Sequence, residues 1–175
     1  MRFFRRYWYR PPALLFWALL LLIPVVNWDF LTGTRVETPE TDEDRRQCLA
    51  LNIYWEARSE PEVGQRAIAA VTLNRVLSSR FPNTICGVVH QGGSGKRHRC
   101  QFSWYCDGRP DIPQEKRAWQ RSLKLADQIL SVGLQDTLDG ALFYHATHVS
   151  PGWTKKMQQV RQIGEHVFYR PAAQS

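Results

Sequence analysis

Residues 48–75 read CLALNIYWEARSEPEVGQRAIAAVTLNR and predict two helices joined by a tight turn. In the first half, one face at helical spacing is formed by Leu49, Asn52, Ile53 and Glu56. In the second half and just beyond it, apolar side chains recur at Ala67, Ile68, Val71, Leu73 and Val76. The two runs are separated by Pro61, and the residue before a proline is disfavoured in a helix. We therefore expect one helix over residues 41–58 and a second helix that ends near residue 79.

Both helices carry start signals. Thr41 and Asp44 have the spacing of a capping box, and Ser59 and Glu62 repeat that spacing before the second helix. Pro61 fits a first helical turn because its missing N–H group is not needed there. Local side chains alone therefore predict both starts.

The rest of the chain predicts a loop, one more helix and a hairpin. Residues 80–110 are rich in Gly, Pro, Asn, Cys and His and predict an irregular loop, which is usually functional at that length. Asp111 and Gln114 are expected to cap a third helix, with Gly133 beyond its end. Two short strands are predicted at residues 141–145 and 165–169. The predicted fold class is therefore α+β, mainly helical, with a small C-terminal β-hairpin.

The N-terminal segment differs from everything that follows it. Four arginines and an apolar run over residues 11–26 form the pattern of an export signal whose basic end stays in the cytoplasm. No small-x-small cleavage pattern follows, so we interpret residues 1–31 as an uncleaved membrane anchor helix, with a cleaved signal peptide as the alternative. A linker, residues 32–40, and an exported domain, residues 41–175, complete the chain. We predict a single-pass inner-membrane protein with its domain in the periplasm.

The charge and the cysteines narrow the class of protein. Outside the leader arginines, 19 Lys and Arg residues stand against 16 Asp and Glu residues, which argues against nucleic acid as a partner. An even cysteine count in an exported domain favours disulfides, in any of three pairings, among Cys48, Cys86, Cys100 and Cys106. Zinc is the competing interpretation, because His90 and His98 lie among the last three cysteines. No C-x-x-C pair is present, so we predict disulfides and no metal.

Glu56 is the outstanding candidate for chemistry. It shares the predicted apolar face with Ile53 and directly follows Tyr54 and Trp55. A poorly hydrated carboxyl group favours its neutral form, which raises its pKa. A general acid needs that neutral form to protonate a glycosidic oxygen near neutral pH. The competing interpretation is a surface glutamate that pairs with an arginine such as Arg58.

A series of motifs supports the first interpretation. Residues 48–75 contain aromatic residues beside Glu-Ala-Arg-x-Glu, then Gly-Gln-x-Ala-x-Ala and Asn-Arg. Further motifs are RFPNTICGVVHQ (80–91), CQFSWYCD (100–107), GALFYHA (140–146) and IGEHVFY (163–169). Together they resemble the spore-cortex-lytic (SleB-like) cell wall hydrolase family over about residues 45–170. The resemblance implies a fold like that of lysozymes and lytic transglycosylases, and a partner in peptidoglycan, cut between N-acetylmuramic acid and N-acetylglucosamine. It implies Glu56 as the catalytic residue and no cofactor.

The reaction type depends on whether a second carboxylate is present. Retaining and inverting glycosidases usually need one. The candidates are Glu60, Glu62 and Asp107, for which the proline, the predicted cap and a turn give simpler explanations. We therefore favour a lytic transglycosylase, in which Glu56 protonates the leaving oxygen and the C6 hydroxyl of muramic acid closes onto C1. The alternatives are a hydrolytic muramidase at the same site and a non-catalytic peptidoglycan-binding scaffold. A zinc amidase is disfavoured because no H-E-x-x-H spacing occurs.

Supporting residues are expected from the loop and the first strand. Gln101 and Ser103 carry side chains suited to an N-acetyl group or to Glu56. Adjacent strand residues point to opposite faces, so only one of Tyr144 and His145 reaches the cleft, and we predict Tyr144. Sugar stacking is expected from one tryptophan among Trp55, Trp104 and Trp153. Arg58 is expected to orient this region through an ion pair.

Overall fold

The computed structural model describes residues 39–92, 99–133 and 136–172. The predicted anchor, residues 1–31, lies outside the described residues, as do residues 32–38 of the linker. Within the described ranges, no helix has the length and apolar character that a membrane span requires.

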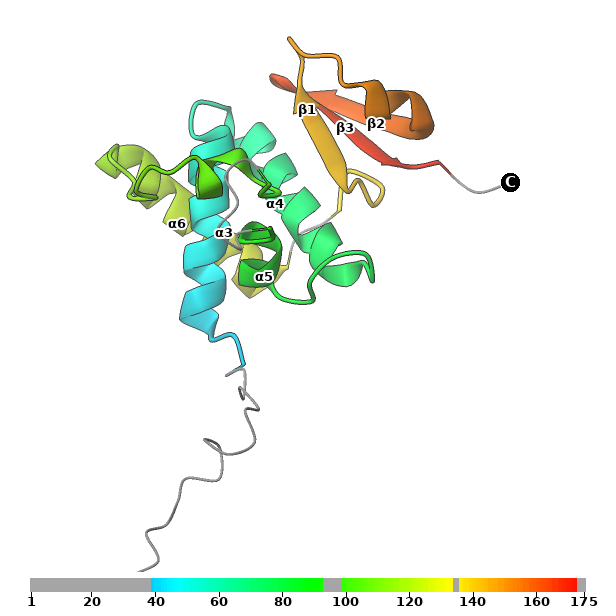
Figure 1. Ribbon diagram of the computed structural model, residues 1–175. Coiled ribbons are helices and arrows are strands. Elements are labelled where there is room, and N and C mark those ends of the chain that lie inside the picture. The colour runs from blue at the N-terminus through cyan, green and yellow to red at the C-terminus, as the bar shows by residue number, and fades with distance from the viewer. Residues whose placement is uncertain (1–38, 93–98, 134–135, 173–175) are drawn as a thin grey trace, which may run out of the picture. The chain divides into compact units, whose positions relative to one another are not determined.

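Helices come first and strands last along the chain (Figure 1). The helices are α3 (Asp42–Ala57), α4 (Glu62–Leu77), α5 (Ile85–Val89) and α6 (Lys116–Val132). Two 3-10 turns are η2 (Ser103–Cys106) and η3 (Gly152–Lys156). The strands are β1 (Phe143–Ala146), β2 (Met157–Ile163) and β3 (His166–Pro171). The α+β class with mainly helical content is therefore confirmed.

The two predicted capping boxes have opposite outcomes. At α3, the Thr41 hydroxyl accepts from the Asp44 N–H at 3.1 Å and the Asp44 carboxylate accepts from the Thr41 N–H at 3.0 Å, which confirms the first box. The second box, at Ser59 and Glu62, is wrong. The N-cap of α4 is Pro61, which has no side-chain cap. Because the proline ring disfavours helix at the preceding residue, the helix begins two residues later than a cap at Ser59 requires.

The N-terminal end of α6 is stabilised by a residue that is distant in the sequence. The expected caps at Asp111 and Gln114 are wrong, since the N-cap is Glu115 and no side-chain cap bond forms there. Instead, the buried Tyr54 hydroxyl accepts from the backbone N–H groups of Gln114 and Glu115 at 3.1 and 3.0 Å. A phenol from α3 thus satisfies N–H groups at a helix start that would otherwise lack partners.

The described parts of the segment 80–110, residues 80–92 and 99–110, contain more regular structure than predicted. They include α5, capped by the Thr84 hydroxyl on the Gly87 N–H at 3.1 Å, and they include η2. Two disulfides fix them: Cys48–Cys86 joins α3 to α5, and Cys100–Cys106 closes the η2 segment. The prediction of disulfides is confirmed. No cluster able to hold a metal ion occurs among the described residues, and His98 lies outside them.

The sheet has three antiparallel strands in the order β1-β3-β2, so the expected two-stranded hairpin is incomplete. The two predicted strands do pair, as β1 with β3, with Tyr144 opposite Phe168. Between them the chain adds β2, which was missed. Its apolar residues Met157 and Val160 are three positions apart because the register shifts between Gln159 and Arg161, and this irregularity hides the alternation of a strand.

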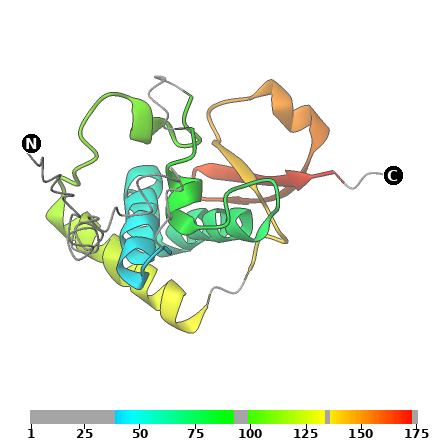
Figure 2. The ribbon, with the colours of Figure 1, turned by 60° about the horizontal axis from the view of Figure 1, so that its bottom comes forward.

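The core consists of two hydrophobic clusters that meet near Tyr144. One joins α3, α5, α6 and the η2 segment, with Leu49, Val88, Trp104 and Ile129 among its members. The other lies between α4 and the sheet and includes Val71 and Phe168. Tyr144 packs against both clusters. In both views the sheet lies on the α4 side of the helices, with α6 on the far side of α3 (Figures 1 and 2).

Candidate active site

Glu56 lies in the last turn of α3, partly buried, where the helices meet the sheet. The Tyr144 hydroxyl on β1 donates a hydrogen bond to its Oε2 at 2.9 Å. Burial raises the pKa of the Glu56 carboxyl, and this effect outweighs the Tyr144 hydrogen bond and the Arg75 charge, which both lower it. Its Oε1 has no hydrogen bond within the described residues. The carboxyl group is therefore suited to hold a proton and to offer it to a ligand.

Aromatic rings surround the helix face beside Glu56. Trp55 stacks on Trp104, with ring centroids 6.2 Å apart and planes inclined by 22°. The buried indole N–H groups of both tryptophans have no hydrogen-bond partner in the described residues. Both rings border a cavity of about 220 Å³, whose other lining residues are Asp107, Arg109, Pro110, Asp111, Ile112 and Gln114. This cavity combines apolar surface with groups able to bind hydroxyls or amides.

The strand β1 directs its two candidates to opposite faces of the sheet. Tyr144 points to Glu56, whereas His145 pairs through Nε2 with the Tyr169 hydroxyl at 3.0 Å. Trp153 joins His145 and Tyr169 in an aromatic cluster, with ring centroids 5.8 and 5.4 Å from theirs. Trp153 therefore packs with His145, while Tyr144 contacts the acid.

Arg58 and the loop residues differ in what they touch. Arg58 forms an ion pair with Glu115 at 2.7 Å and lies over the Tyr54 and Trp55 rings, so it ties the end of α3 to the start of α6. Gln101 and Ser103 are exposed. Within the described ranges, no hydrogen bond joins either side chain to Glu56. The structure thus brings Tyr144 to Glu56, but gives Gln101 and Ser103 no direct contact with it.

Each candidate for a second carboxylate has other partners. Glu60 accepts from the Glu165 N–H at 3.1 Å, and Glu62 pairs with Arg66 at 2.7 Å. Asp107 accepts from the Arg109 N–H at 2.8 Å.

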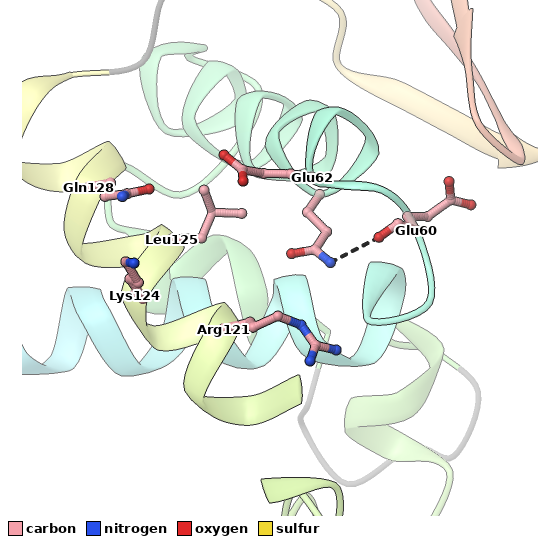
Figure 3. A pocket seen from close by; sticks show the side chains of 7 residues that line it. Glu60, Glu62, Arg121, Lys124, Leu125 and Gln128 are labelled. Carbon is pink, nitrogen blue, oxygen red and sulfur yellow. Dashed lines mark hydrogen bonds between the residues drawn. The ribbon is translucent and has the colours of Figure 1, made fainter. Parts of the chain in front are cut away.

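Figure 3 shows a second groove, which is polar and has no aromatic lining; in it the Gln65 side-chain amide donates to the Glu60 backbone carbonyl at 3.0 Å. It is formed by Glu60, Glu62, Gln65, Arg121, Lys124, Leu125 and Gln128.

Arg75 is a buried charged residue close to Glu56 and Tyr144 in its electrostatic effect, which the sequence did not single out. In the sequence it stands only as part of the Asn-Arg motif near the end of the second helix. In the structure it is 2% exposed, and its charge affects the pKa values of both Glu56 and Tyr144. Its position in the Asn-Arg motif was the only available signal, because nothing local indicates that this arginine is buried.

Fold and site together define a class: small α+β domains that hold one protonatable carboxyl group where helices and sheet meet. The chain belongs to the Cell Wall Hydrolase family, which matches residues 59–169 and confirms the resemblance carried by the motifs. The matched span includes Tyr144 and the whole of β1 and begins three residues after Glu56. The family is therefore established independently of the acid.

Named relatives and solved structures agree with this assignment. The chain is 32% identical over 137 residues to a spore cortex-lytic enzyme of Halalkalibacterium halodurans, covering 78% of this chain and 37% of that one. It is 34% identical over 124 residues to a spore cortex-lytic enzyme of Bacillus subtilis, covering 70% and 36% respectively. The chain thus spans little more than a third of the length of these two relatives.

Two solved catalytic domains match over almost their whole length. That of the Bacillus cereus SleB protein has a TM-score of 0.55 and 30% identity, covering 79% of this chain and 99% of the other. That of the germination-specific lytic transglycosylase SleB from Bacillus anthracis has a TM-score of 0.56 and 30% identity, covering 76% and 99%. The described domain therefore corresponds to the catalytic part of these relatives.

Proposed function

We propose that this domain cuts the glycan strand of peptidoglycan between N-acetylmuramic acid and N-acetylglucosamine, with Glu56 as the general acid. One observation carries the proposal: burial raises the pKa of the Glu56 carboxyl while its Oε1 makes no hydrogen bond in the described residues. A protonated carboxyl with a free oxygen can reach a glycosidic oxygen. The spore cortex-lytic names of the relatives support the same polymer as substrate.

The reaction we propose is that of a lytic transglycosylase. Glu56 gives its proton to the leaving glycosidic oxygen as the bond from that oxygen to C1 breaks. The resulting carboxylate accepts the proton of the muramic acid C6 hydroxyl, and O6 bonds to C1 to give a 1,6-anhydro end. No second protein carboxylate is required, which agrees with the other partners of Glu60 and Asp107. The Bacillus anthracis relative is named as a lytic transglycosylase.

The cavity lined by Trp55 and Trp104 is proposed as a sugar subsite; Trp55 precedes Glu56 in the chain. Trp55 and Trp104 supply apolar surface for a pyranose ring. Asp107 and Asp111 border the same cavity and can accept hydrogen bonds from sugar hydroxyls. Gln101 and Ser103 remain candidates for contacts that form with bound substrate.

We also propose that the domain works in the periplasm, anchored to the inner membrane by residues 1–31. The two disulfides support an oxidising compartment. The arginine-flanked apolar run supports the anchor.

The test is a digest of purified peptidoglycan by the full-length protein, with EDTA present, read by mass spectrometry. We expect fragments with anhydro-muramic ends, one water lighter than hydrolysed ends, and none from Glu56→Gln. Glu62→Gln is the matched control, because Glu62 only pairs with Arg66 on the helix surface, and it should cut normally. Reducing muramic ends would instead establish a hydrolytic muramidase. No cleavage by the wild type would favour the non-catalytic scaffold.

A further inference from the structure

Arg75 is a buried cation that forms no ion pair with any residue that the structure describes. It lies in the last turn of α4, and its Nε donates to the Leu142 carbonyl at 2.8 Å, two residues before Tyr144. The guanidinium carbon is 5.2 Å from the ring centroids of both Phe81 and Phe102. Its Nη1 is buried and has no hydrogen-bond partner in the described part of the chain.

Burying the Arg75 guanidinium in this way is energetically unfavourable unless its charge has a function. No ion pair to Arg75 occurs within residues 39–92, 99–133 and 136–172. Burying a charge removes its hydration, and the Leu142 carbonyl and the two phenyl rings return only part of that cost. An apolar side chain between the two phenyl rings would hold α4 against the strand at lower cost. The fold alone therefore does not explain an arginine at this position.

We propose that Arg75 is a positioning residue for the reaction: a fixed buried charge that stabilises the carboxylate formed when Glu56 has given up its proton. This inference rests on the proposed function and adds the group that makes the acid able to release its proton. Arg75 acts through Glu56 and is not expected to touch the substrate.

The proton balance at Glu56 explains why such a charge is needed. Burial favours the protonated carboxyl, but an acid that held its proton too tightly could not transfer it. The groups that oppose burial in the described residues are Tyr144 from β1, through its hydrogen bond, and Arg75 from α4, through its charge. His166 of β3 lies against the Tyr144 ring, with centroids 5.4 Å apart. The carboxylate is thus formed where one donor and one cation already favour it.

Asn74, the residue before Arg75, allows the effect of the Arg75 charge to be distinguished from the effect of anchoring the chain. Asn74 donates from Nδ2 to the Ala141 carbonyl at 3.2 Å, so it holds the same segment before β1 with a neutral side chain. If Arg75 served only as an anchor, removing Asn74 would have the same kind of effect on catalysis. If its charge matters, the two positions behave differently.

The experiment compares pH–rate profiles of kcat/KM for the full-length protein and four variants. Arg75→Met fills the space between the rings, and Arg75→Gln keeps a donor for the Leu142 carbonyl, but both lack the charge. Arg75→Lys keeps a charge, and Asn74→Ala is the matched control. Two neutral variants are included so that one suffices if the other does not fold. Circular dichroism and thermal melting check the fold of each variant.

We expect either neutral variant to lower kcat/KM about ten- to a hundred-fold. The activity of the wild type falls as pH rises through the pKa of Glu56, because the acid is lost. Without the Arg75 charge that pKa rises further, so the alkaline limb moves to higher pH. Arg75→Lys keeps a positive charge at neutral pH, so its alkaline limb should coincide with that of the wild type. Asn74→Ala should melt at a lower temperature, and its alkaline limb should not move.

An unmoved alkaline limb in a folded neutral variant, or an equal shift in Asn74→Ala, would overturn the role of Arg75. That failure is distinguishable from failure of the proposed function. In the latter case the wild type gives no cleavage, or Glu56→Gln cleaves as well as the wild type.

Discussion

Glu56 and Glu60 lie four residues apart and have different surroundings. Among the described residues, Glu56 receives one hydrogen bond, from the Tyr144 hydroxyl. The Glu60 side chain is 7% exposed, accepts from the Glu165 N–H and has the His166 Nδ1 at 3.5 Å. Its Oε2 also fills the space beside Gly164, where any Cβ would collide with it.

The difference between the two regions lies in which groups use the carboxyl oxygens. At Glu60, Oε1 accepts from the Glu165 N–H and lies 3.5 Å from the His166 Nδ1, while Oε2 packs against Gly164, so the carboxylate fixes the β2–β3 turn against the start of α4. At Glu56 one oxygen is left without a hydrogen-bond partner in the described residues, and burial favours the proton. The two carboxyl groups therefore differ in what their oxygens contact, which is a backbone N–H and a glycine turn at Glu60 and a tyrosine hydroxyl at Glu56.

The largest expected effect is that of Glu56→Gln. We expect kcat/KM to fall by about 10²–10⁴-fold, because Gln cannot supply a proton. Stability should rise near neutral pH. The raised pKa means that the folded wild type is favoured below the ordinary value of 4.5 and loses stability as pH rises toward the folded-state pKa. The neutral amide avoids that loss and can still accept from Tyr144.

Peptidoglycan digests and melting curves at pH 4 and pH 7 check both parts. The gain in melting temperature should be larger at pH 7. Residual cleavage together with a large loss of stability would give Glu56 a structural role and remove the contrast with Glu60.

For Glu60→Ala we expect a loss of stability with little change in kcat/KM, which is the reverse of the result for Glu56→Gln. Its removal leaves the Glu165 N–H without its acceptor and loses the packing on Gly164, so unfolding should become easier by about 1–3 kcal/mol. The kcat/KM of the remaining folded enzyme should stay within a few-fold of the wild type. Urea unfolding, monitored by tryptophan fluorescence, measures the change.

Glu60→Gln sharpens this prediction, because the amide oxygen can still accept from the Glu165 N–H. It should lose less stability than Glu60→Ala. If Glu60→Gln folds well but abolishes cleavage, Glu60 is a second catalytic carboxylate and the comparison with Glu56 fails.

The sequence predicted those features that depend on neighbours in the chain. The capping box at Thr41 and Asp44 needs only a spacing of three, and the helical face that includes Glu56 needs only a period. The α6 start could not be predicted, because the acceptor for its N–H groups is Tyr54, sixty residues earlier. The strand β2 was missed because the irregularity at Gln159 breaks its alternation.

The same distinction holds for the candidate site: local patterns predicted some of its features, and contacts between distant parts of the chain were missed. Alternation along β1 predicted that Tyr144 and His145 face opposite ways, and motif order pointed to Glu56. The engagement of Glu60 by Glu165 depends on a contact over 105 residues, which no local pattern carries. The burial of Arg75 likewise depends on where the chain returns at Leu142.

A moderate effect is expected for Tyr144→Phe. The hydroxyl donates to the Glu56 Oε2 and favours the carboxylate, so its loss should lower kcat/KM about ten-fold and raise the pKa of Glu56. The alkaline limb of the pH–rate profile should therefore move to higher pH. Tyr169→Phe is the control, because that hydroxyl pairs with His145 on the other face of the sheet. Equal effects of the two variants would mean that sheet stability, not the bond to Glu56, limits the rate.

The smallest expected effect concerns His166, which links the two regions by touching both the Tyr144 ring and Glu60. Burial lowers the pKa of His166 and His145 adds to this, while the nearby Glu60 and Glu165 oppose it. The unfolded chain therefore binds more protons than the folded protein below the ordinary value of 6.5. Stability should be complete above that pH and should decline as the pH falls toward the folded-state pKa.

His166→Gln should flatten this decline, by less than about 1 kcal/mol between pH 7 and pH 5. Melting temperatures across that range measure it, with His148→Gln as the control because His148 is exposed. His90, whose pKa burial also lowers, contributes equally to all three proteins and cancels. A steeper decline in His166→Gln would mean that the charged histidine pairs favourably with Glu60, so that the Glu60 region gains stability on protonation instead of losing it.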